Sequence, residues 1–304
     1  MKLFVIGNGF DRGHGLSTSY WNFRTYLQNM YPGFLHEFEK HYDIYPAWFD
    51  EEKQRLLWNE LETNLANIDE DVIIEDALHM DLGLESGDVG ILDTLDEYFE
   101  NEYKYIEELA RYLKLWVRTI RIRDVMPKTT MIKNENDAFY ITFNYTAVLE
   151  TVYKVNDNTI LHIHGSLRQN DDDPILGHGN EKRINDIKGK RYDAEEIFDE
   201  KAMSICRAVE NYYKRTFKNI RNYIYKLSRL SNKEVDEVII IGHSLAGVDI
   251  PYFEEIERIT QRRTTWKVYY YCDGERQRML DSLISCGIDA RRIEMIHSSE
   301  FYDV

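Results

Sequence analysis

The stretch of residues 2–15 reads KLFVIGNGFDRGHG, and it decides the fold class. Residues 2–6 form a mostly apolar run that ends at Gly7. Such a run is typical of a buried parallel strand, because helices cover both faces of a parallel sheet. Glycines directly after the strand let the backbone approach a phosphate, and the next helix offers N–H groups and the positive end of its dipole. We therefore expect an open parallel sheet that binds a ligand beyond its first strand.

The glycine spacing departs from the dinucleotide-binding fingerprint G-x-G-x-x-G, because Arg12 stands where the third glycine should be. There is also no clear acidic residue about twenty positions on, at the end of a second strand. A regular dehydrogenase is therefore not predicted. A glycine-rich turn without a ligand remains the alternative interpretation of residues 7–15.

Strand and helix patterns alternate along the rest of the chain. Apolar runs typical of strands lie at 138–143, 159–163, 237–241, 266–272 and 292–296, with a weaker one at 174–177. Helical periodicity is found at 20–31, from Pro251 onward and at 275–286. Strands that alternate with helices predict a mainly parallel sheet.

Two proline-free stretches, 48–123 and 193–231, have apolar residues at steps of three and four and predict helical insertions. The second has the pattern of one long helix. The acid-rich segment 69–102 within the first is typical of a solvated face or a loop. We expect the insertions to pack together as a second subdomain. The nucleotide-binding core then comprises residues 1–47, 124–192 and 232–304.

The composition excludes some functions. The chain of 304 residues has 38 Lys and Arg against 54 Asp and Glu, which gives a net charge of −16. Because phosphate binding rests on Lys and Arg, nucleic acid is an unfavoured partner. Aromatic residues make up 13% of the chain, which favours a packed core over disorder.

The cysteines indicate the compartment. Cys206, Cys272 and Cys286 are scattered and include no C-x-x-C pair. This fits a reducing cytoplasm and argues against a disulfide framework or a four-thiolate zinc site. No apolar stretch approaches the roughly 20 residues that span a bilayer, and nothing resembles a signal peptide. We expect a cytoplasmic protein with no membrane partner.

The segment Phe143-Asn144-Tyr145-Thr146 follows a predicted strand. Asn144 has donor and acceptor atoms that can orient a ribose hydroxyl or a water molecule. Alternatively, Asn144 caps a helix that begins near Thr146, since Asn is a favoured N-cap.

The next strand ends in His162-Ile163-His164-Gly165-Ser166, and a period of two puts both histidines on one face. His164, which lies nearest the strand end, is a candidate general base near neutral pH. A metal pair completed by His178 is an alternative. His162 fits a satisfied core histidine.

The segment from Gly242 to Asp249, GHSLAGVD, resembles a nucleophile elbow with Ser244 as the nucleophile and His297 as a later triad member. In an elbow, however, the helix starts directly after the serine. Asp249 as N-cap and Pro251 in the first turn place the helix start several residues later. Ser244 therefore fits a hydroxyl that binds a phosphate or a ribose better than a nucleophile.

The four motifs GNGFD, FNYT, HIHGS and GHSL…D occur in this order, each after a predicted strand. Together they resemble the AbiH-type bacteriophage abortive-infection family, with a sirtuin-like NAD-binding core. The resemblance covers residues 3 to about 258. It implies a sirtuin-like Rossmann parallel sheet with large α-helical insertions.

The resemblance also implies site residues. Asn144 and His164 would be catalytic: Asn144 would orient the ribose or a water, and His164 would be the base, so both should face one cleft beside the first glycine turn. The nucleotide would be bound by Gly7, Asn8, Gly9, Phe10, Asp11, Gly165, Gly242, His243, Ser244 and Asp249.

Sirtuin deacylases carry a four-cysteine zinc module, which three scattered cysteines cannot build. The resemblance therefore implies antiphage defence through hydrolysis of NAD⁺ at the nicotinamide N-glycosidic bond, with NAD⁺ as substrate and no metal. Two alternatives stay open: a metal-dependent nuclease or phosphohydrolase that uses His162, His164 and His178, and a non-catalytic sensor of an NAD derivative. A phage-derived trigger and a homo-oligomer also stay open as partners.

Overall fold

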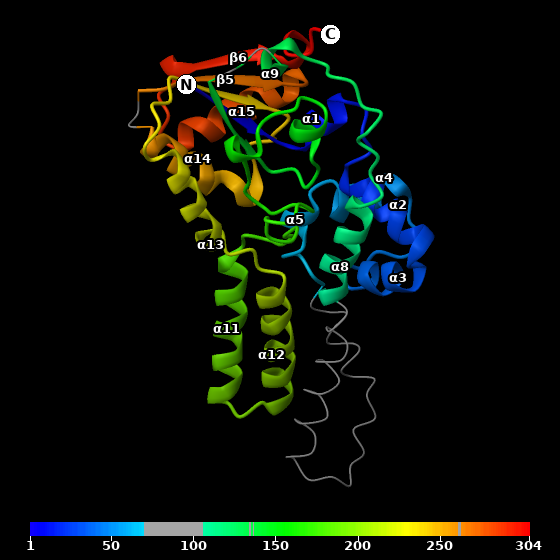
Figure 1. Cartoon of the computed structure of the whole chain (residues 1–304). Helices are drawn as coiled ribbons and strands as arrows, with labels where there is room; N and C mark the ends of the chain where they lie inside the picture. The colour runs from blue at the N-terminus through cyan, green and yellow to red at the C-terminus, as the bar shows by residue number, and fades with distance from the viewer. Residues whose placement is uncertain (70–105, 134, 136, 261–262) are drawn as a thin grey trace. The chain divides into compact units, whose positions relative to one another are not determined.

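The computed structural model describes residues 1–69, 106–133, 135, 137–260 and 263–304 (Figure 1). The chain divides into two compact units. Unit 1 comprises Met1–Ser19, Lys114–Ile175 and Asn219–Val304, and unit 2 comprises Tyr20–Leu113 and Leu176–Lys218.

Within the described residues, unit 1 holds a sheet of six strands in the order β3-β2-β1-β4-β5-β6. The strands are β1 (Lys2–Ile6), β2 (Ala138–Thr142), β3 (Ile160–His162), β4 (Glu237–Ile241), β5 (Thr265–Tyr270) and β6 (Ile293–His297). All neighbouring strands pair in parallel. This is the strand order of a Rossmann-like sheet, and it confirms the predicted α/β fold.

The register brings the strand-end motifs to one edge. Ile6, the last residue of β1, pairs with Thr142 at the end of β2 and with Ile241 at the end of β4. The chain order reverses between β1 and β4, which makes this pair the topological switch point, where open α/β sheets bind ligands.

Short helices connect the strands of unit 1. They are α1 (Asn8–Gly13), α9 (Thr130–Lys133), α10 (Val148–Thr151), α13 (Arg221–Ile224), α14 (Ile250–Ile259) and α15 (Asp273–Ser285), with 3-10 turns at Asp157–Thr159, Tyr225–Leu230, Gly247–Asp249, Ala290–Arg292 and Ser298–Glu300. Alternate residues of the strands point to opposite faces of the sheet and belong to two different apolar clusters. One joins Val5 and Ile240 to Tyr252 of α14. The other joins Phe4 and Ile6 to Phe10 of α1. The sheet therefore has a covered core on both faces.

Unit 2 is helical in its described residues. Its elements are α2 (Tyr20–Met30), α3 (Pro32–Lys40), α4 (Asp50–Lys53), a π-helical turn at Gln54–Trp58, α5 (Leu61–Asn64), most of α8 (Ile106–Val117), α11 (Glu181–Glu196) and α12 (Glu200–Arg215). A buried ion pair supports its core: Arg24 bonds both carboxylate oxygens of Glu39, and Trp58 Nε1 donates to the same carboxylate at 2.7 Å.

The unit boundaries differ from those expected. Residues 20–47 belong to unit 2, because the rings of Tyr31 and Phe34 pack on Tyr112 of α8 at centroid distances of 3.9 and 4.8 Å. Residues 176–192 also belong to unit 2, as part of the α11–α12 hairpin. Residues 219–231 belong to unit 1, because Leu227 joins the sheet core.

Two predicted elements are wrong. The pattern over 193–231 is not one helix: α11 ends before Ile197, and α12 starts anew with Asp199 as N-cap, whose side chain accepts from Ala202 N at 2.9 Å. The weak strand at 174–177 is absent from the described residues, which show only an isolated bridge between His178 and Phe217 there. Apart from Asp69, the acid-rich segment 69–102 lies outside the described residues.

A search of the described helices for one long and apolar enough to cross a membrane finds none.

Candidate functional site

The turns after β1 and β4 touch each other through glycines. A Cβ on Gly7 would lie 2.6 Å from the carbonyl oxygen of Gly242, and a Cβ on Gly242, whose φ is +69°, would lie 2.1 Å from Phe10 N. The N–H groups of Gly9 and Phe10 donate to Gly242 O at 2.7 Å and to Gly7 O at 3.0 Å. The glycines thus serve the contact between the two turns, and phosphate binding by this turn stays a prediction.

Two other residues of the first turn have structural partners. Asn8 Nδ2 donates to Thr18 O at 2.8 Å. The Phe10 ring is buried and packs edge-on against Phe301 at 6.3 Å. Phe10 therefore belongs to the core in this structure, and its predicted contact with a nucleotide remains untested.

The Asp11 carboxylate is buried beside the end of β2. Asn144 Nδ2 donates to Asp11 Oδ1 at 2.8 Å and to Gly7 O at 3.1 Å, and the Thr146 hydroxyl donates to Asp11 Oδ2. Burial raises the pKa of Asp11 to about 6, although the hydrogen bonds from Thr146 and Asn144 oppose the shift. Asn144 Oδ1 is buried and has no hydrogen-bond partner among the described residues.

The cap interpretation of Asn144 is wrong. Helix α10 begins at Val148, and its N-cap position is Ala147. The Asn144 side chain instead joins β2 to the first turn, a contact between residues more than 130 positions apart that no local pattern could indicate.

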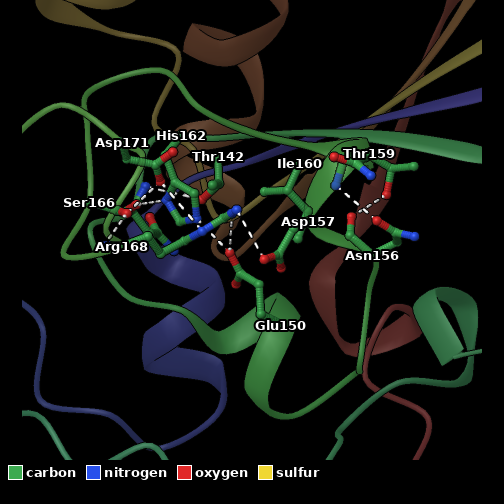
Figure 2. A network of polar contacts seen from close by, with 12 residues as sticks. Thr142, Glu150, Asn156, Asp157, Thr159, Ile160, His162, Ser166, Arg168 and Asp171 are labelled. Atoms are coloured by element: carbon green, nitrogen blue, oxygen red, sulfur yellow. Dashed lines mark hydrogen bonds and ion pairs between the residues drawn. The ribbon is translucent and has the colours of Figure 1, made fainter.

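His162 lies beside Glu150 in a network of polar contacts (Figure 2). Its Nδ1 lies 3.0 Å from the carbonyl oxygen of Asn144, and its Nε2 lies 2.8 Å from Glu150 Oε1. Both ring nitrogens of His162 therefore face an acceptor oxygen. Burial alone raises the pKa of Glu150, but the hydrogen bond and charge of His162 and the charge of Arg168 hold it below its ordinary value.

Arg168 ties the segment after β3 to this network (Figure 2). Its Nη1 donates to Glu150 Oε1 at 2.9 Å, and its Nη2 lies 3.3 Å from Asp157 Oδ2. Ser166 accepts from Arg168 N at 3.0 Å and donates to Asp171. These ion and hydrogen-bond contacts join Ser166, Arg168 and Asp171 to one another and to Glu150.

Gly165 allows the same segment to fold back. Its φ is +80°, and a Cβ would lie 2.4 Å from the carbonyl oxygens of Asp172 and Asp173. Ile175 N donates to His164 O at 3.0 Å, so the returning chain lies against His164. The need for glycine at this position therefore has a structural cause, and nucleotide binding by Gly165 stays a prediction.

His164 faces a carboxylate. Its Nε2 lies 3.3 Å from Asp249 Oδ1, and Nε2 of His243 lies 3.4 Å from the other oxygen, Asp249 Oδ2. His243 Nδ1 accepts from Leu245 N at 2.9 Å, so the hydrogen of a neutral His243 is on Nε2 and points toward Asp249. The Phe143 ring packs edge-on against both imidazoles. Asp249 thus lies between two buried histidines.

The structure gives the two catalytic candidates different partners. Asn144 bonds to α1, which packs with the Phe4 and Ile6 cluster, whereas the His164 ring packs with Tyr252 of the other cluster at 5.6 Å. Strand β3 ends at His162, so its period of two does not extend to His164. The two histidines therefore have different partners. Asn144 and His164 also have different partners, and a cleft that both of them face stays a prediction.

Ser244 is not arranged as a nucleophile. Helix α14 begins at Ile250 after the N-cap Asp249, as predicted, and Ser244 itself is exposed. The proposed partner His297 is engaged elsewhere: its ring nitrogens lie 2.7 Å from Ser299 Oγ and 3.1 Å from Tyr271 O. These contacts disfavour a serine hydrolase.

His178 belongs to unit 2 and is fully buried. Its Nε2 lies 3.0 Å from Tyr213 O, and its Nδ1 accepts from Asn180 N at 3.1 Å. Burial lowers its pKa to about 4, which keeps the ring neutral. Across the part of the chain that the structure describes, no group of three or more His, Cys, Asp or Glu residues is arranged to hold a metal ion.

Sequence reasoning missed three residues of the site: Thr146, Glu150 and Arg168. The signal available was weak, because each is a polar residue within a few positions of a strand-end motif. Their pairing with Asp11 and His162 depends on tertiary contacts.

Comparison with known proteins decides the family. The family model described as "Bacteriophage abortive infection AbiH" matches residues 3–270, from β1 through β5. The chain belongs to the AbiH family. This membership supports a role in abortive infection by bacteriophage, and all four strand-end motifs lie inside the matched region of this AbiH chain. No curated protein matches the chain.

Proposed function

We propose that this protein is an abortive-infection effector that hydrolyses NAD⁺ at the nicotinamide N-glycosidic bond. The observation that carries the proposal is the contact between His164 and Asp249 at the carboxyl edge of a Rossmann-like sheet. Open parallel sheets bind nucleotides at this edge, beside the switch point. A histidine oriented by a carboxylate is an arrangement that suits a general base.

The reaction asks little of the protein. Nicotinamide leaves as a neutral molecule while the ribose approaches an oxocarbenium-like transition state, as in glycoside hydrolysis. Water adds to the ribose C1′ and gives up one proton, so the products are ADP-ribose, nicotinamide and a proton. In the proposal, His164 accepts this proton, and Asp249 orients the imidazole and stabilises its charged form.

His243 and Asn144 have supporting roles in this mechanism. The Nε2 hydrogen of His243 faces Asp249 Oδ2 and helps to fix the carboxylate that holds His164. Asn144 donates to Gly7 O and to Asp11, so in the proposal it positions the first turn.

Burial of the base fits an effector that is silent before infection. His164 is only 2% exposed, and the segment 165–175 folds back beside it. An unrestrained enzyme that consumes NAD⁺ would harm its host. In the proposal, substrate reaches His164 after this segment moves, and the trigger acts by favouring that movement.

The test is to incubate the purified full chain with NAD⁺, with and without lysate of phage-infected cells, and to measure nicotinamide. We expect release in at least one condition. His164→Ala and Asp249→Asn should lower the rate by about 10²–10⁴-fold, the usual contribution of general-base catalysis. The control is His297→Ala, which removes an exposed histidine at the end of β6 and should leave the rate unchanged.

The other outcomes of this assay contradict the proposal or favour one of the alternative functions. Absence of nicotinamide in both conditions contradicts the proposal. Saturable NAD⁺ binding in calorimetry without turnover identifies a sensor instead of an enzyme. Release that a chelator abolishes would favour metal chemistry.

A further inference from the structure

The turn between α11 and α12 in unit 2 carries two large apolar side chains into solvent. Ile197 is 74% exposed and Phe198 is 87% exposed. Figure 1 shows the two helices side by side, and this turn joins them. Scattered apolar residues on a surface need no explanation by themselves. A second property of Phe198 makes this turn different.

The backbone of Phe198 is in the left-handed region, with φ of +56°. Glycine or asparagine usually occupies this position at the end of a helix, because a side chain is disfavoured there. Asp199 N donates to Ala194 O at 2.9 Å and Phe198 N donates to Glu195 O at 3.2 Å, which closes the turn. A glycine would make the same bonds, so the turn does not require phenylalanine.

Some of the charges around the turn are also unfavourable for the isolated hairpin. Residues 193–200 contain five carboxylates and no Lys or Arg; the carboxylates belong to Asp193, Glu195, Glu196, Asp199 and Glu200. Glu195 and Glu196 lie at the C-terminal end of α11, where the helix dipole disfavours negative charge. Asp199 and Glu200 lie at the N-terminal end of α12, where the helix dipole favours negative charge. The cost in charge is therefore confined to Glu195 and Glu196, and it adds to the cost in backbone strain at Phe198.

We propose that residues 192–200, the hairpin tip, are a docking site for another protein with an apolar pocket rimmed by Lys and Arg. Phe198 would fill the pocket as an aromatic anchor, and the five carboxylates would select a basic rim. The same carboxylates disfavour an anionic membrane or nucleic acid. A second copy of this chain is also disfavoured, because its own net charge is −16.

The experiment places the photo-crosslinker p-benzoylphenylalanine at position 198 of the full chain, in cells before and during phage infection. We expect one discrete protein adduct whose contact peptide contains Lys or Arg. In the Glu195→Lys, Glu196→Lys background its yield should fall at least about tenfold, a loss worth about 1.4 kcal/mol. The crosslinker at Phe49, which is 75% exposed in the same unit, is the control and should not give this adduct.

Stability separates docking from a structural role. Phe198→Gly removes the strain, and the two lysines complement the helix dipole, so each variant should raise Tm, by roughly 2–4 °C per kcal/mol gained. Both should nevertheless lose protection against a phage that the wild-type chain restricts, while Phe198→Trp should retain it.

The proposal is overturned by the absence of an adduct in infected and uninfected cells alike. It is equally overturned by an adduct with a second copy of the chain, with lipid or with nucleic acid. An adduct yield that stays the same in the Glu195→Lys, Glu196→Lys background also overturns it. A lower Tm in Phe198→Gly would show that phenylalanine stabilises the turn, which contradicts the premise. None of these outcomes depends on NAD⁺ hydrolysis.

Discussion

At the scale of single residues, burial decides what the motif side chains can do. Asp11, Asn144 and His164 come from three motifs that are each recognisable in the sequence, and all three are buried in the structure. A buried polar group must find partners inside the protein. Asn144 donates a hydrogen bond to Asp11, whereas His164 faces Asp249. Similar motifs thus lead to different chemical environments.

Asp11 makes the stability of the protein depend on pH. Its pKa rises from 3.8 to about 6 on folding, so between these values the folded state holds a proton that the unfolded state has lost. Stability from this group is therefore full below pH 4 and falls as pH rises through 6. Two pKa units correspond to about 3 kcal/mol.

We expect Asp11→Asn to remove this fall. The amide can accept from Asn144 and donate to Thr146, so the hydrogen bonds persist without the buried charge. Urea unfolding from pH 4 to pH 7 measures the effect: the free energy of unfolding of the variant should gain about 3 kcal/mol relative to wild type over this range. Parallel profiles for the two proteins would refute the assignment.

At the scale of elements, the contact between two turns governs the edge of the sheet. The turn after β1 and the turn after β4 approach so closely that only glycines fit at the contact. From the sequence, the glycines after the first strand are predicted to bind a phosphate. The structure shows backbone packing there, because parallel pairing in register brings the ends of β1 and β4 together.

Gly242→Ala should be strongly destabilising. Its left-handed φ costs a side chain about 1–2 kcal/mol, and overlap with Phe10 N adds about 1–3 kcal/mol of overpacking. Gly15→Ala is the matched control, since Gly15 has φ of +81° but nothing within 4 Å of an added Cβ. Urea unfolding of the two variants should therefore differ by the overpacking cost. Equal losses would show that the turns can separate without penalty.

At the scale of the whole molecule, the chain builds two cores from interleaved stretches. Unit 1 closes around the sheet, and unit 2 closes around helices and a buried ion pair between Arg24 and Glu39. Both side chains of this pair are at most 6% exposed. Because each unit has a core of its own, a lesion in one core should affect that unit first.

Glu39→Ala should destabilise unit 2 by about 3–5 kcal/mol, because it leaves the Arg24 charge buried without its partner. Calorimetry should then resolve a separate, earlier transition for unit 2. The control Glu108→Ala breaks an exposed pair with Arg111 and should leave the melting profile unchanged. A single transition that moves as a whole in Glu39→Ala would show that the two units unfold together.

The sequence by itself determined the sheet and the family. The five longer strands carry local apolar runs, and helix α14 starts where Asp249 and Pro251 predict it. Such features depend on neighbours within a few residues, so a pattern can reveal them. The sequence pattern did not reveal the break between α11 and α12, because the break depends on a cap at Asp199 and a left-handed backbone at Phe198 and not on a proline.

Only the tertiary structure decided the partners of the site residues. The contacts of Asn144 with Gly7, of His162 with Glu150 and of His164 with Asp249 join different elements of unit 1. Burial and charge select these pairs after the strands have brought their ends to one edge, and no periodicity carries that information. The different partners of His162 and His164 have the same cause: β3 ends at His162, and the chain beyond it no longer follows the alternation of the strand.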